Sequence, residues 1–79
     1  MSKHDSKNVE QFLNDMHGAE DMDEAAFQEA INHTVIAVEK DDMYNTKEKL
    51  KIYSTLTSLS NCDVDERVKW IKKAARTLK

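Results

Sequence analysis

The chain has 79 residues, of which 39% are hydrophobic and 34% are charged, and its formal net charge is −3. This length sets a limit of one domain, and the composition is too apolar for a disordered chain and too charged for a membrane segment. No apolar run approaches the ~20 residues needed to span a bilayer, and residues 1–8 lack the apolar core of a signal peptide. The single Cys excludes a disulfide within the chain. We therefore expect a cytoplasmic protein without a membrane partner.

The chain has no Pro and only one Gly, Gly18. β-Proteins of this size usually need several of these turn-forming residues. The abundance of Ala, Lys, Glu and Leu favours helices joined by short polar turns. The composition therefore predicts an all-α fold.

The first predicted helix covers about residues 7–16 and follows a flexible tail at residues 1–5. Asp5 or Ser6 can cap this helix by accepting backbone N–H bonds. Gly18 can end it, because glycine adopts the left-handed backbone conformation of a helix C-cap at little cost. The i, i+3, i+4, i+7 spacing predicts an apolar face formed by Val9, Phe12, Leu13 and Met16.

The second predicted helix covers about residues 24–40. Asp23 can cap it, and Met22 and Phe27 have the spacing of a hydrophobic staple. The stretch HTVIAVEK is rich in β-branched residues, but its 3.6-residue period favours a helix over a strand. The buried stripe is expected to contain Phe27, Ile31, Thr34, Val35 and Val38. Acidic residues crowd the N-terminal end, where the helix dipole favours them, and form a candidate acidic surface of Glu20, Asp21, Asp23 and Glu24.

The third predicted helix covers about residues 46–60. Asn45 and Glu48, at its start, have the spacing of a capping box. Ser and Thr are frequent near its end, and they weaken a helix because their side chains compete for backbone hydrogen bonds. Its broad apolar face contains Leu50, Ile52, Tyr53, Leu56 and Leu59.

The fourth predicted helix covers about residues 64–79, with Asp63 and Glu66 at capping-box spacing. Its apolar seam is narrow and contains Val64, Val68, Ile71, Ala75 and Leu78. We find no internal repeat and no linker in the sequence. Four short amphipathic helices with tight turns therefore predict one compact bundle over residues 6–79.

Charge is divided unevenly between the two halves of the chain. Residues 1–43 contain eleven acidic and three basic residues, a net charge of −8, whereas residues 44–79 contain four acidic and nine basic residues, a net charge of +5. In one interpretation the basic fourth helix packs near the acidic second helix and the charges pair internally. In the other, the charges face a homodimer mate, another protein or a nucleic acid.

The only Trp lies in the basic C-terminal helix, on the border of its apolar seam. Trp70 either closes the edge of the core with its N–H at the surface or serves as a contact residue. In a nucleic-acid complex its ring would stack on a base while the nearby cations meet phosphates. The candidate partner-binding residues are therefore Arg67, Lys69, Trp70, Lys72, Lys73 and Arg76.

Patterns typical of enzymes and metal proteins are absent from the sequence. One Gly cannot form a Gly-rich phosphate loop, and the acidic run NDMHGAEDMDEA lacks the ligand spacing of an EF-hand. His4, His17, His33 and Cys62 do not have the spacing of a metal site. A helix-turn-helix is also disfavoured, because the start of the fourth helix is acidic. We expect no catalytic residues, no metal and no cofactor.

These patterns predict a non-enzymatic protein–protein interaction module, which acts as a small cytoplasmic regulator, adaptor or inhibitor by binding a partner protein. The alternative is a nucleic-acid-binding module that uses the basic C-terminal helix with Trp70.

Overall fold

The computed structural model of the protein describes the backbone of residues 4–78 and the side chains of residues 7–78. Over this range the chain is helical and contains no strand, which confirms the predicted all-α bundle. The elements in chain order are α1 (His4–Asp15), the 3-10 turn η1 (Ala19–Asp21), α2 (Glu24–Lys40), α3 (Thr46–Asn61), the 3-10 turn η2 (Val64–Glu66) and α4 (Arg67–Leu78).

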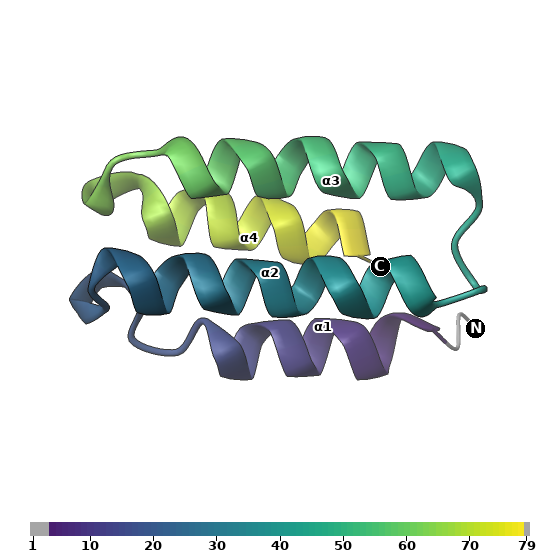
Figure 1. The fold of residues 1–79 in the computed structure, drawn as a ribbon, viewed down its shortest axis with the longest axis horizontal. Helices are drawn as coiled ribbons and strands as arrows, with labels where there is room; N and C mark the ends of the chain where they lie inside the picture. The colour runs from purple at the N-terminus through teal and green to yellow at the C-terminus, as the bar shows by residue number, and fades with distance from the viewer. Residues whose placement is uncertain (1–3, 79) are drawn as a thin grey trace.

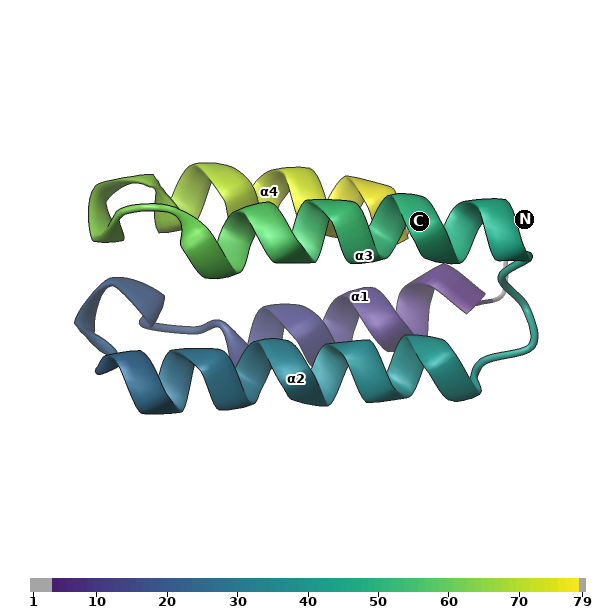
Figure 2. The same ribbon diagram turned by 45° about the horizontal axis from the view of Figure 1, so that its top comes forward.

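The four helices form a bundle of two hairpins (Figure 1). Helices α1 and α2 form one layer, and α3 and α4 form the other (Figure 2). Each helix packs against the next one in the chain, and α4 also packs against α1. The interpretation that the fourth helix packs near the second holds at one end of the bundle, where Arg67 of α4 pairs with Glu24 of α2. Over the rest of their length α2 and α4 lie diagonally across the bundle.

Two of the predicted helix starts are confirmed by their hydrogen bonds. The Ala26 backbone N–H donates to Asp23 Oδ1 at 2.8 Å and caps α2. At the start of α3, Glu48 N–H donates to Asn45 Oδ1 at 2.8 Å and Asn45 N–H donates to Glu48 Oε1 at 2.9 Å, which completes the capping box. Gly18 follows α1 with a φ of 75° and lets the chain turn into η1.

Two other predicted helix starts differ from the structure. Helix α1 begins at His4, so the backbone of Asp5 and Ser6 lies inside its first turn and not before it, and their side chains lie outside the described residues. Residues 4 and 5 of the predicted tail therefore belong to α1, and residues 1–3 lie outside the described residues. The Asp63 side chain makes no capping bond, because Val64–Glu66 forms a 3-10 turn before α4 begins. In that turn Glu66 N–H donates to the Asp63 backbone oxygen at 2.9 Å.

The core positions of the two hairpins correspond at a constant offset of 40 residues. Every buried residue from 12 to 38 has a buried counterpart 40 positions later, giving the pairs Phe12 and Ile52, Met16 and Leu56, Ala19 and Leu59, Phe27 and Arg67, Ile31 and Ile71, Thr34 and Ala74, and Val38 and Leu78. The residue types mostly differ within a pair, which is why the sequence shows no repeat. The two hairpins therefore present equivalent faces to one shared core.

The buried face of α4 differs from the predicted seam. Its buried residues are Arg67, Ile71, Ala74 and Leu78, whereas Val64 and Val68 are 48% and 39% exposed. The helix is rotated about its axis relative to the prediction because Arg67 points into the core. Leu13 and Leu50, also expected on apolar faces, are exposed as well.

Tyr44 fastens the end of the bundle opposite Arg67. Its hydroxyl donates to the Leu78 backbone oxygen at 2.7 Å, and its side chain is buried. Asn8 Nδ2 donates to Asp41 Oδ2 at 2.6 Å and to the Tyr44 hydroxyl at 3.3 Å. These bonds connect α1, the turn between α2 and α3, and the end of α4.

We expect Tyr44→Phe to lower the free energy of unfolding by about 1 kcal/mol, because the Leu78 carbonyl loses a buried hydrogen-bond donor. Urea denaturation followed by circular dichroism measures this change. Tyr53→Phe is the matched control, since the Tyr53 hydroxyl has no hydrogen bond among the described residues, and it should change stability by less than about 0.5 kcal/mol. Equal losses in the two variants would contradict the role assigned to the Leu78 bond.

Candidate functional site

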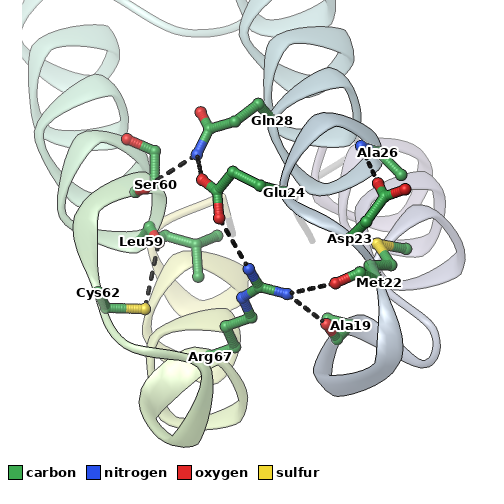
Figure 3. A network of polar contacts seen from close by, with 10 residues as sticks. All are labelled: Ala19, Met22, Asp23, Glu24, Ala26, Gln28, Leu59, Ser60, Cys62 and Arg67. Carbon is green, nitrogen blue, oxygen red and sulfur yellow. Dashed lines mark hydrogen bonds and ion pairs between the residues drawn. The ribbon is translucent and has the colours of Figure 1, made fainter.

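Arg67 is the one buried residue among the candidate site residues. Its side chain lies inside one end of the bundle, where its Nη1 donates to the backbone oxygens of Ala19 at 2.7 Å and Met22 at 3.1 Å (Figure 3). Its Nη2 donates to Glu24 Oε1 at 3.2 Å. The guanidinium carbon lies 3.8 Å from the centre of the Phe27 ring, a favourable cation–π geometry.

These contacts make Arg67 a structural residue that joins the two hairpins. It is 2% exposed and so does not belong to the exposed basic surface that the sequence predicts, which is a correction to the candidate set. Its Nε is buried without an acceptor among the described residues, so stacking on Phe27 must offset part of the desolvation cost. No local pattern in the sequence signals this role, because the two backbone oxygens that accept from Arg67 belong to residues far earlier in the chain.

The candidate acidic surface is largely used to start α2 and to hold Arg67. Asp23 caps the helix, and Glu24 accepts from both Arg67 and Gln28, with the Gln28 contact at 2.8 Å. Gln28 Nε2 also donates to the Ser60 backbone oxygen at 2.9 Å, which extends this network to α3 (Figure 3). Glu20 and Asp21 are exposed in η1.

The remaining bases of α4 form an exposed basic face made of Lys69, Lys72, Lys73 and Arg76. Among the side chains of residues 7–78, Arg67 forms an ion pair with Glu24, and His33 Nδ1 lies 2.7 Å from Asp15 Oδ2. No cation of the basic face pairs with a carboxylate in that part of the chain. Of the internal pairing considered from the sequence, the described residues show the contact of Arg67 with Glu24.

Trp70 lies at the edge of the core beside this basic face. It is half-buried and packs against the core cluster. Lys73 Nζ lies 4.7 Å from the centre of its ring, so one face of the indole is partly covered by a cation. By the 40-residue offset Trp70 takes the position of Ala30 in the first hairpin. This placement limits the area of the indole left for stacking.

Cys62 is half-buried at the turn between α3 and η2, and its Sγ lies 3.2 Å from the Leu59 backbone oxygen. Burial raises the pKa of its thiol above the ordinary value of 9.0 and outweighs the opposing effect of the Arg67 cation. The thiolate is the reactive form of cysteine, so this environment does not activate Cys62 as a nucleophile.

The described part of the chain shows no group of three or more His, Cys, Asp or Glu side chains that could hold a metal ion. None of its helices is long and apolar enough to cross a membrane.

No family model matches the chain, and neither a curated protein nor a solved structure shows significant similarity to it. Its function must therefore be inferred from its own surface.

We expect Arg67→Ala to lower the free energy of unfolding by about 2–4 kcal/mol, because it removes buried volume and the donor to two backbone oxygens. Thermal or urea unfolding measures this loss. Glu24→Gln should cost less than about 1 kcal/mol, since its carboxylate is largely exposed. Arg76→Ala, on the exposed side of the same helix, should be near neutral. A small effect of Arg67→Ala would contradict its structural role.

Alkylation of Cys62 by iodoacetamide should require a higher pH in the native protein than in the unfolded chain. The pKa of the thiol is higher in the folded protein than in the unfolded chain, so the native thiol keeps its proton at a pH where the unfolded thiol has lost it. The protonated thiol therefore contributes to the stability of the fold at low pH, and this contribution is lost as pH rises through the folded pKa. Rates followed by mass spectrometry from pH 7 to 10, with and without denaturant, test this. Glu66→Gln should lower the native midpoint, since the Glu66 charge raises the pKa. A native midpoint below the unfolded one would refute the assignment.

Proposed function

We propose that the protein is an interaction module that binds a partner protein through the outer surface of α4. The observation that carries the proposal is the basic face, whose cations are unpaired within the described side chains, next to the exposed Val64 and Val68. Single exposed apolar residues are ordinary on a protein surface. Val68 on α4 and Val64 in the preceding 3-10 turn, together with four cations, form the mixed apolar and polar surface that protein interfaces use.

A module of this kind acts by occupancy, as a regulator, adaptor or inhibitor that covers a surface of its partner. It needs no catalytic group for that role. The rigid bundle holds the α4 side chains in place before binding, which reduces the entropy lost on association. A cytoplasmic location is part of the proposal and fits the free thiol of Cys62.

Nucleic-acid binding is the second candidate, and the four exposed cations favour it. Two observations weigh against it. Trp70 is half-buried with Lys73 over its ring, so it offers little surface for base stacking. Asp63, Asp65 and Glu66 are exposed just before the basic face and would repel phosphates.

A photo-crosslinking amino acid at Lys72 should capture a defined protein in extracts of cells that produce the chain. The same group at Lys40, which is exposed at the end of α2, is the position control and should not capture that protein. Changing Lys69, Lys73 and Arg76 to Gln should abolish capture at Lys72. Capture of the same proteins at both positions would refute the proposal.

Trp70 emission supplies the test of the second candidate. For a protein-binding module, single- and double-stranded nucleic acid should leave it unchanged at low and moderate salt. A saturable quench of the Trp70 emission that weakens steeply with salt would show that the basic face binds nucleic acid.

A further inference from the structure

We infer that the partner of this protein presents an acidic amphipathic helix, which lies along the valley between α1 and α4. The inference rests on the proposed function and adds the partner's chemistry to it. Two observations support it: the assignment of each helix flank to a neighbouring helix, and the apolar and charged side chains that lie on those flanks.

The flanks of α2 are fixed by observed contacts. One flank, with Gln28 and Val35, lines a groove of about 240 Å³ together with Tyr53 and Thr57 of α3. The other flank carries His33, whose Nδ1 lies 2.7 Å from Asp15 Oδ2 of α1. The first flank of α2 therefore faces the following helix, and the second faces the preceding one.

The same assignment applies to α4, because α2 and α4 run in the same direction (Figure 1) and bury equivalent positions 40 residues apart. The counterparts of Gln28, Asn32 and Val35 are Val68, Lys72 and Ala75. In the ring of four helices the neighbour on that side of α4 is α1. Val68 and Lys72 therefore border the valley between α4 and α1, whereas Trp70 lies on the flank toward α3.

Leu13 borders the same valley from the other side. Asn8 and Gln11 lie on the flank of α1 that meets α2, where they line a small pocket with His33 and Thr34. Leu13 lies on the opposite flank by helical geometry, and the other neighbour of α1 is α4. Leu13 and Val68 are 46% and 39% exposed, so this valley has apolar side chains on both banks.

The cations that border the valley indicate that the partner helix is acidic. Val68, Lys72 and Arg76 are successive i, i+4 neighbours on α4 and form one ridge that is apolar at its start and cationic at its end, and Val64 precedes this ridge in the 3-10 turn η2. A partner helix with an apolar stripe would cover the valines and Leu13, and acidic residues beside that stripe would meet Lys72 and Arg76. A valley between two helices fits the rounded ridge of a third helix.

A nucleic acid is a poorer match for this valley. Phosphates would use the cations of the ridge and leave Leu13 and Val68 uncovered. Dependence on the apolar residues therefore separates a protein helix from a polyanion.

The test is fluorescence anisotropy with a labelled peptide of about 18 residues, long enough for helix formation, built from Leu, Glu and Ala with Leu on one face. The full chain should bind this peptide but not a scrambled peptide of the same composition. Lys72→Gln with Arg76→Gln should weaken binding about tenfold, and Leu13→Ser with Val68→Ser by a similar factor. Circular dichroism confirms that each variant is folded.

Matched control variants lie on α3, diagonally across the bundle from α1. Lys47→Gln with Lys51→Gln removes two exposed cations there, and Leu50→Ser removes a leucine that is 62% exposed. All three changes should leave peptide binding unchanged. Equal effects of these control changes and the valley changes would overturn the inference, because binding would then lack a defined place on the surface.

Three further results would overturn the inference. Equal affinity for the scrambled peptide or for an oligonucleotide of the same charge would identify a general polyanion surface. A dimer in sedimentation that dissociates on Leu13→Ser with Val68→Ser would identify a second copy as the occupant. If the peptide does not bind but crosslinking at Lys72 is retained, the inference of an acidic helix is refuted and the proposal of a protein partner still stands.

Discussion

The placement of Arg67 inside the bundle is the constraint on which the rest of the surface depends. Its guanidinium satisfies two backbone oxygens at the end of the first hairpin turn and stacks on Phe27 at the point where the hairpins meet. Because Arg67 points inward, α4 is rotated so that Val68 points outward, and Val64 is exposed in the preceding 3-10 turn. A buried cation that organises a turn has thus also produced the exposed apolar residues next to the basic face.

Local signals in the sequence predicted the four helices and the starts of α2 and α3. The capping box of Asn45 and Glu48 and the cap at Asp23 depend on residues within one turn of each other, so spacing alone reveals them. The rotation of α4 could not be predicted in this way. The oxygens that accept from Arg67 belong to residues more than 40 positions earlier, and an arginine is assigned to the surface by its type.

The candidate site was also predicted only in part, because helical periodicity is a local signal and the packing of one helix on another is not. The exposed positions of Lys69, Lys72, Lys73 and Arg76 follow from helical periodicity, and so does the border position of Trp70. The exposure of Leu13 and Val68 does not, because each fits an apolar stripe in sequence and is excluded from the core only by tertiary packing. The sequence shows the uneven charge of the two halves of the chain, whereas only the fold shows that these halves form two opposite layers (Figure 2).

The constant offset between the two sets of core residues gives the chain the character of a tethered dimer. Each hairpin buries one half of a common core, and the short turn between α2 and α3 holds the halves at a high effective concentration. The union of the hairpins is then intramolecular and independent of protein concentration. If that turn were cut, assembly of the same core would become a bimolecular reaction, with a midpoint that depends on how much of each half is present.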